Sequence, residues 1–107
     1  MTGKILGTGS YVPGRTVENN DLAKLVDTND AWIRERTGIE RRHVTEEETT
    51  SAMASRAARK ALENGGISPE EIDLILVATS TPDIIFPCVA CRVQKEIDAV
   101  NAVCFDL

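Results

Sequence analysis

The sequence predicts an α/β fold, because short apolar segments alternate with helical patterns along the chain. The clearest strand is the apolar run 73–79, which is typical of a strand covered on both faces in a parallel or mixed sheet. The clearest helix is 51–64, whose small and apolar residues recur at helical spacing and whose end is marked by two glycines. The residues on this helical face are Ala54, Ala58, Ala61 and Leu62.

The N-terminal part of the chain predicts a strand, a loop and a short helix. We expect a strand over 4–9 that ends in glycines, and a loop over 10–16 with turn signals. Asn19 or Asn20 is a suitable N-cap for the short helix that follows. Its buried face would consist of Leu22, Leu25 and Val26.

A second helix is predicted over 29–36. Asp27 and Thr28 are suitable N-caps for it, and Gly38 provides its end. The segment 39–44 that follows is expected to be extended, with its charged residues facing outward.

The C-terminal part predicts one turn of helix, a longer helix and a last strand. Residues 68–71 have a capping-box pattern, and Pro87 opens a helix with Val89, Val93 and Ile97 along one stripe. The run 102–107 reads as a third strand with no helix after it, which would leave an open sheet. We therefore expect 1–107 to be a partial N-terminal half-domain. A small α/β protein with an edge strand at its end is the alternative.

Composition excludes several classes of protein. The 107 residues carry a formal net charge of −5, so the generally basic footprint of a nucleic-acid-binding protein is absent. No apolar run approaches the ~18 residues of a membrane span, and the N-terminus does not resemble a signal peptide. An odd number of cysteines favours free thiols and a cytoplasmic location. They are Cys88, Cys91 and Cys104.

Several stretches of the chain resemble the β-ketoacyl-acyl-carrier-protein synthase III family of thiolase-like condensing enzymes. The most specific is 26–39, VDTNDAWIRERTGI, which contains a Trp-Ile pair and an Arg-Thr-Gly-Ile sequence. The others are 7–13 (GTGSYVP), 19–22 (NNDL), 52–61, 73–81 and 86–87 (FP). Together they run along the whole chain.

The resemblance implies a thiolase-like fold of five layers, α-β-α-β-α, of which this chain would supply three strands of the N-terminal half. It also implies that the catalytic cysteine lies a few residues beyond Leu107, and that the catalytic histidine and asparagine lie further on. We therefore expect no catalytic residue in this chain. Cys104 is not expected to be the nucleophile, since the chain offers it no partner base.

A candidate nucleotide-binding site comes from Thr28, Trp32 and Arg36, which are spaced four residues apart and would share one helix face. An indole stacks on a base, and a guanidinium contacts phosphate. A half-buried structural tryptophan is the other interpretation of this spacing. The resemblance implies that these residues form the mouth of a coenzyme A tunnel, with Trp32 stacked on adenine and Thr37 adding a hydrogen bond.

Two further patterns favour structural roles. The basic run of Arg36, Arg41, Arg42 and His43 could steer phosphates or an acidic carrier protein, but a solvated charged strand is the favoured interpretation. Cys88 and Cys91 have Cys-x-x-Cys spacing, but no second ligand pair accompanies them, so no metal site is expected.

Phe86 follows an exposed-looking loop, where a large apolar side chain packs inward or against a partner. The resemblance implies that it crosses a homodimer interface and closes the partner's acyl pocket.

The resemblance further implies the reaction of the longer parent protein. An acyl-CoA, with acetyl-CoA as the expected primer, would condense with malonyl-acyl-carrier-protein. No metal or redox cofactor is implied, because the coenzyme A thioester is a substrate of the reaction. A related condensing enzyme of polyketide or signalling-molecule synthesis is the second interpretation. A non-catalytic coenzyme A-binding or dimerisation module is the third, for the isolated chain.

Overall fold

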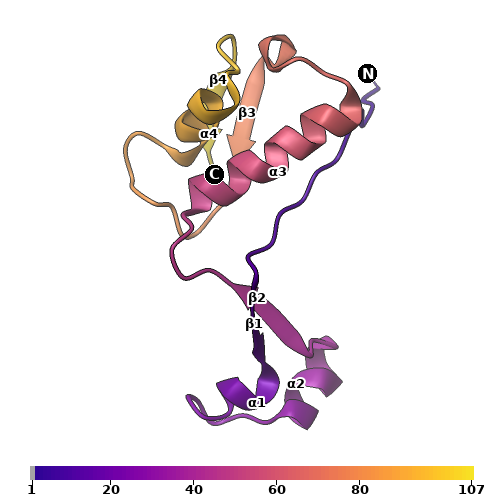
Figure 1. Cartoon of the computed structure of the whole chain (residues 1–107), viewed down its shortest axis with the longest axis vertical. Helices are drawn as coiled ribbons and strands as arrows, with labels where there is room; N and C mark the ends of the chain where they lie inside the picture. The colour runs from indigo at the N-terminus through magenta and orange to yellow at the C-terminus, as the bar shows by residue number, and fades with distance from the viewer. Residues whose placement is uncertain (1) are drawn as a thin grey trace. The chain divides into compact units, whose positions relative to one another are not determined.

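The structure is a computed structural model that describes residues 2–107, and it divides into two compact units (Figure 1). The larger unit contains the chain up to Tyr11 together with Glu48–Leu107, and the smaller unit is Val12–Glu47. In chain order the elements are β1 (Arg15–Glu18), α1 (Asn19–Leu22), α2 (Asp30–Thr37), β2 (Arg41–Val44), α3 (Thr50–Gly65), the 3-10 turn η1 (Pro69–Glu71), β3 (Leu74–Val77), α4 (Val89–Ile97) and β4 (Val103–Asp106).

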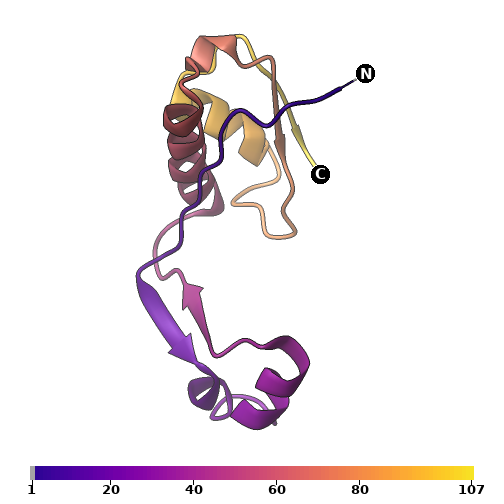
Figure 2. The same ribbon diagram turned by 90° about the vertical axis from the view of Figure 1, so that its right-hand side faces the viewer.

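The core of the larger unit lies between a sheet and two helices. Strands β3 and β4 are parallel neighbours, which confirms two of the three predicted strands. Helix α4 packs against the sheet, and α3 packs against α4 (Figure 2). The predicted stripe of α4 forms the buried cluster, and the predicted small-residue face of α3 packs against it. The buried residues are Val89, Val93, Ile97 and Ala99, and those of α3 are Ala54, Ala58 and Leu62.

Only one face of the sheet is covered within residues 2–107. Ile75 and Val77 point into the core, whereas Leu74 and Leu76 on the other face are about half exposed. The prediction that this strand is covered on both faces is therefore wrong for the part of the chain that the structure describes. A continuous apolar run shows that both faces avoid water, but it does not show which segment covers each.

The segment 4–9 is not a strand, contrary to the prediction. It runs in extended form along α3 without a sheet partner (Figure 2). Lys60 Nζ donates to the Ser10 carbonyl at 3.0 Å, and Asn64 Nδ2 donates to the Thr8 carbonyl at 2.7 Å. A Cβ atom at Gly9 would collide with the backbone of α3. These glycines therefore permit a close approach of two backbones and do not mark the end of a strand.

The smaller unit is built around an antiparallel pair of strands, of which only the second was predicted, as the extended segment 39–44. β1 and β2 pair antiparallel, with Arg15 opposite Val44 and Glu18 opposite Arg41. Helix α1 is a single turn after the N-cap Glu18, so neither Asn19 nor Asn20 caps it. Its predicted buried face is also wrong, since Leu25 and Val26 are exposed.

The centre of the smaller unit is a polar side chain. Asn19 is 1% exposed. Its Nδ2 donates to Asp30 Oδ1 at 2.9 Å and to the Ile39 carbonyl at 2.7 Å, and its Oδ1 accepts from Arg42 Nη1 at 3.0 Å. One amide therefore joins α1, α2 and β2, because each of its bonds goes to a different element or to the segment beside it.

Candidate functional site

The candidate nucleotide site lies on α2, whose ends are fixed by local capping. Asn29 is the N-cap, and its side chain accepts from the Trp32 amide at 2.8 Å. Gly38 ends the helix in the left-handed conformation with φ of 71°, as predicted. Ile33 is the buried residue of this helix and anchors it in the unit. The opposite surface is left free to carry exposed side chains.

Trp32 and Arg36 form a pair on the exposed surface of α2. The Arg36 Cζ atom lies 4.5 Å from the centroid of the Trp32 ring, which is a cation–π contact between residues one turn apart. Trp32 nevertheless remains 51% exposed. The guanidinium covers part of the indole, and the rest of the ring is accessible to a flat ligand.

Arg36 also differs from the other arginines of the smaller unit. Among residues 2–107, it makes no hydrogen bond or ion pair, so its cation is satisfied by the indole and by solvent alone. By contrast, Arg34 contacts Asp30 at 2.8 Å and Glu40 at 2.7 Å. An unpaired guanidinium beside an exposed aromatic ring is suited to bind an anionic group attached to a flat base.

The two threonines assigned to this site lie differently from the prediction. Thr28 precedes the N-cap, so it is outside α2 and does not share a helix face with Trp32. The prediction that 28, 32 and 36 form one helical row is therefore wrong for Thr28, because Asn29 is the capping residue. The Thr37 hydroxyl donates to the Ile33 carbonyl at 2.7 Å and accepts from the Ile39 amide at 3.1 Å. This hydroxyl group therefore stabilises the C-terminal end of α2.

The rest of the basic run is engaged within the smaller unit. The Arg41 and Arg42 guanidiniums and the His43 ring each have a partner, so only Arg36 of this run is unpaired among the described residues. The partners are Glu18 at 3.5 Å, Asn19 at 3.0 Å and the Pro13 carbonyl at 2.7 Å, respectively. Since that carbonyl only accepts, His43 Nδ1 donates.

Phe86 lies in the larger unit, on the segment 78–88 between β3 and α4, and is 88% exposed. The segment is anchored before it by Asp83, which accepts from the Ser51 amide at 3.0 Å and from Arg92 Nη1 at 3.2 Å. Burial raises the pKa of Asp83, but the hydrogen bonds from Ser51 and Thr50 and the charge of Arg92 outweigh it and lower the pKa overall. Phe86 is therefore exposed on a segment that the contacts of Asp83 fix in place.

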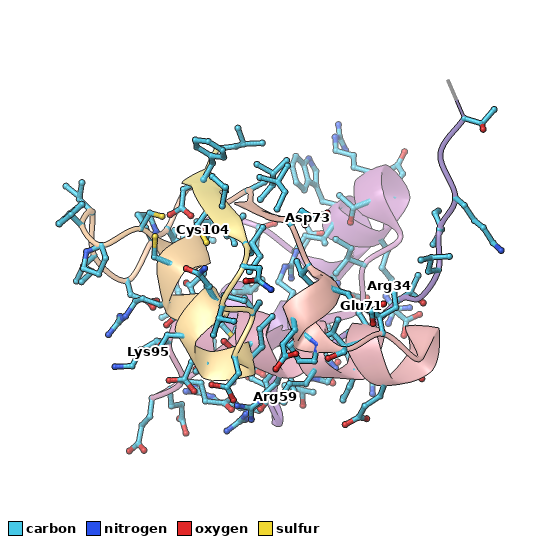
Figure 3. The ribbon with its side chains drawn as sticks, turned by 90° about the horizontal axis from the view of Figure 1, so that it is seen from above. Arg34, Arg59, Glu71, Asp73, Lys95 and Cys104 are labelled. Carbon is cyan, nitrogen blue, oxygen red and sulfur yellow. The ribbon has the colours of Figure 1, made fainter. Side chains whose placement is uncertain are left out.

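Neither Cys91 nor Cys104 has the surroundings of an activated nucleophile, because the pKa of each thiol is raised. Burial raises the pKa of Cys104, which lies on β4 close to α4 (Figure 3). The one histidine of the chain is bonded to the Pro13 carbonyl. Within residues 2–107, no group of three or more His, Cys, Asp or Glu residues could hold a metal ion, and no helix is long and apolar enough to cross a membrane.

Sequence reasoning missed two residues that position these features. Asn19 was considered only as a cap, although an amide next to a helix start can also satisfy several elements at once. Asp106 was assigned only to a strand, but its carboxylate accepts from the amides of Val89 and Ala90, the first two residues of α4. An acidic residue at the end of a parallel strand was the available signal for this second role.

The chain is similar to known proteins along almost its whole length. No protein-family model matches the chain. Over 104 residues, which are 97% of it, the chain is 54% identical to the β-ketoacyl-[acyl-carrier-protein] synthase III of Clostridium tetani. It spans 31% of the length of that relative.

The chain therefore resembles the N-terminal part of the β-ketoacyl-acyl-carrier-protein synthase III enzymes. Solved structures agree. The synthase III of Aquifex aeolicus VF5 matches 97% of the chain with a TM-score of 0.90 and 49% identity, over 34% of its own length. The priming β-ketosynthase of the R1128 polyketide pathway matches 97% with a TM-score of 0.89 and 41% identity, over 31% of its length. The chain thus adopts the N-terminal part of the thiolase-like fold of the synthase III family.

Proposed function

We propose that this chain is part of an enzyme that condenses an acyl-CoA primer, acetyl-CoA in the first instance, with malonyl-acyl-carrier-protein. The product is a 3-oxoacyl-acyl-carrier-protein, and the step begins type II fatty acid synthesis. The name of the Clostridium tetani relative and the fold support this proposal. The single observation in this chain that carries it is the pairing of exposed Trp32 with unpaired Arg36.

The proposed chemistry assigns binding, not bond making, to this chain. A cysteine elsewhere in the enzyme takes the acyl group as a thioester and releases free coenzyme A. Loss of carbon dioxide from the malonyl group then generates the carbanion that attacks the thioester. Because decarboxylation supplies the electron pair of the new carbon–carbon bond, the reaction needs neither a metal nor a redox cofactor. A histidine and an asparagine outside this chain complete the proposed site.

The role of the smaller unit is to hold the nucleotide end of coenzyme A. The exposed indole of Trp32 stacks on adenine, and the Arg36 guanidinium binds a phosphate oxygen. Thr28, which precedes the N-cap of α2, is proposed to contact the same ligand, and Thr37 keeps an acceptor lone pair after closing the helix. The cation–π contact orients Arg36 before the ligand arrives, which lowers the entropy lost on binding.

Two partners besides acyl-CoA follow from this proposal. One is malonyl-acyl-carrier-protein, and the other is a second copy of the enzyme, whose acyl pocket the exposed Phe86 would close across a homodimer interface. No nucleic acid or membrane partner is proposed. The three free cysteines support a reducing cytoplasm as the location.

The decisive experiment is a kinetic comparison of site variants in the full-length enzyme. Trp32→Ala and Arg36→Ala should each raise the KM for acetyl-CoA about tenfold, with a much smaller change in kcat, because they remove ground-state binding. Lys24→Ala is the matched control, since Lys24 is an exposed cation of the same unit that pairs with Asp21 and lies outside α2. An unchanged KM in both site variants would remove α2 from the site.

A second candidate function is chain initiation in polyketide synthesis, favoured by the structural match to the R1128 priming ketosynthase. Carrier-protein and primer preference separates the two. A type II fatty acid carrier protein and acetyl-CoA should give the higher kcat/KM under the first proposal. A polyketide carrier protein and a longer primer should do so under the second.

A non-catalytic coenzyme A-binding or dimerisation module is the candidate for the isolated chain. Calorimetric titration of coenzyme A against residues 1–107 tests it, with Trp32→Ala as the comparison. Binding by the wild type that weakens in the variant would support the module. Absence of binding by either would count against it.

A further inference from the structure

Cys88 and Cys91 lie side by side at the start of α4, and the proposed condensation uses neither. Cys88 is the N-cap and Cys91 is the third residue of the helix, so a Cys-x-x-Cys sequence spans the first turn. The two Sγ atoms are 3.3 Å apart. Both residues are free thiols of intermediate burial. Two thiols this close at the N-terminus of a helix can react with each other on oxidation, which two separate thiols cannot do.

The backbone holds the two cysteines in one turn at the start of α4. The Cys91 amide donates to the Cys88 carbonyl at 3.1 Å, which closes the turn. Cys88 is the N-cap and has extended backbone, and the two Sγ atoms are 3.3 Å apart. A disulfide brings the sulfurs to about 2.05 Å and the Cβ atoms to about 3.5–4.5 Å, so closing the bond requires side-chain rotation together with a small adjustment of the N-cap residue, at the edge of α4.

The surroundings distinguish the two thiols. The hydrogen bond with Cys88, burial and the nearby Cys104 raise the pKa of Cys91 to about 11. Cys88 is the N-cap and precedes the first helical residue, so its thiol is the one that we assign to the attack. The Asp106 carboxylate accepts from the amides of Val89 and Ala90, so these amides do not stabilise a thiolate strongly. Attack should accelerate as the pH rises.

We propose that Cys88 and Cys91 form a redox-active dithiol site that low-molecular-weight disulfides oxidise. The Cys88 thiolate attacks one sulfur of the small disulfide and releases one small thiol, which leaves a mixed disulfide on Cys88. Cys91 then loses its proton, attacks the Cys88 sulfur and releases the second small thiol. Two protein thiols lose two electrons and two protons, and the small disulfide gains both. The site does not depend on the proposed condensation.

Peptide mapping of the purified full-length protein tests this directly. The protein is incubated with glutathione disulfide at mildly alkaline pH, and the remaining thiols are blocked with N-ethylmaleimide before tryptic digestion. The chain has cleavage sites after Lys60 and Arg92 and none between them, so Cys88 and Cys91 share the peptide 61–92. Cys104 lies on another peptide, which begins at Glu96. A bridge within the pair therefore appears as loss of two hydrogen atoms from 61–92, with no blocking group attached.

The variants assign each role. We expect the bridge in the wild type and in Cys104→Ser, and its reversal by dithiothreitol. Cys91→Ser should instead trap a glutathione adduct on Cys88, whereas Cys88→Ser should form no bridge within the peptide 61–92. A wild type in which both thiols are blocked, or in which the bridge forms only after urea is added, would overturn the proposal. Condensation activity is measured separately, so failure of one proposal leaves the other intact.

Discussion

The carboxylate of Asp106, at the end of β4, accepts a hydrogen bond from the Val89 amide at 2.7 Å. Its second oxygen accepts from the Ala90 amide at 2.8 Å, so one side chain satisfies both first amides of α4. Asp106→Ala should lower the free energy of unfolding by about 2–4 kcal/mol, because it removes a cap and two charge-assisted hydrogen bonds. Urea denaturation measures this. Asp73→Ala, at an exposed carboxylate before β3, should change stability by less than about 0.5 kcal/mol.

Asn19 and its neighbour Asn20 provide a matched pair for the smaller unit. Asn19 is buried with three hydrogen bonds, whereas Asn20 is exposed. Asn19→Ala should lower the free energy of unfolding by at least about 2 kcal/mol, because the Ile39 carbonyl loses the hydrogen bond from Asn19 Nδ2. Asn20→Ala should change stability by about 0.5 kcal/mol or less. Equal effects in denaturation experiments would show that Asn19 does not hold the unit together.

Gly9 and Gly14 differ in the space around them. A Cβ atom at Gly9 would collide with the backbone of Ala57 and Ala61 in α3, but one at Gly14 would meet nothing within 4 Å. Gly9→Ala should therefore destabilise by about 1–3 kcal/mol through overpacking. Gly14→Ala should be neutral or should stabilise by up to about 1 kcal/mol. Thermal unfolding followed by circular dichroism measures both. A tolerated Gly9→Ala would contradict the close contact along α3.

Stability should fall in acid because of Asp83. Its folded-state pKa is lowered from the ordinary 3.8, so the carboxylate contributes stability above that value. This contribution is lost as the pH falls through the lower folded-state pKa. In Asp83→Asn, the free energy of unfolding should fall less between pH ~5 and acidic pH than it does in the wild type. An unchanged pH profile of urea midpoints in this variant would show that other carboxylates cause the acid sensitivity.

Phe86 should control primer choice if it closes an acyl pocket in the assembled enzyme. Phe86→Ala should raise the ratio of kcat/KM for longer acyl-CoA over acetyl-CoA by about tenfold or more, since it opens space for several methylene groups. Ile85 is equally exposed, so Ile85→Ala is the control, and its ratio should stay unchanged. The same ratio in both variants and in wild type would exclude Phe86 from the pocket.

Elements with an apolar period and helices with clear end signals, such as α2 and η1, were predictable from the sequence, but the charged strand β1 was not. The runs of β3 and β4 and the stripe of α4 identified the core of the larger unit. Strand β1 and its pairing with β2 were missed because these strands are largely charged and lack the alternation that marks a half-buried strand. The N-terminal segment was misassigned because its glycines fit both a strand end and a close backbone contact.

The candidate site was predictable in its residue types but not in its geometry. Spacing placed Trp32 and Arg36 on one helical face, and the structure confirms that contact. Spacing could not show that Asn29, one residue after Thr28, would begin the helix. It also could not show that Arg36 alone among the arginines of its unit lacks a hydrogen-bond or ion-pair partner in residues 2–107, because pairing depends on where α2 and β2 lie in that unit.

The chain contains a single tryptophan, and it is the half-exposed one beneath Arg36. Indole emission depends on what touches the ring, so Trp32 is a built-in optical reporter for the surface of α2. A stacked purine should quench this emission, and loss of the guanidinium in Arg36→Ala should alter it without any ligand. In a form of the protein with no other tryptophan, each encounter of α2 with a nucleotide becomes visible in real time and without a label.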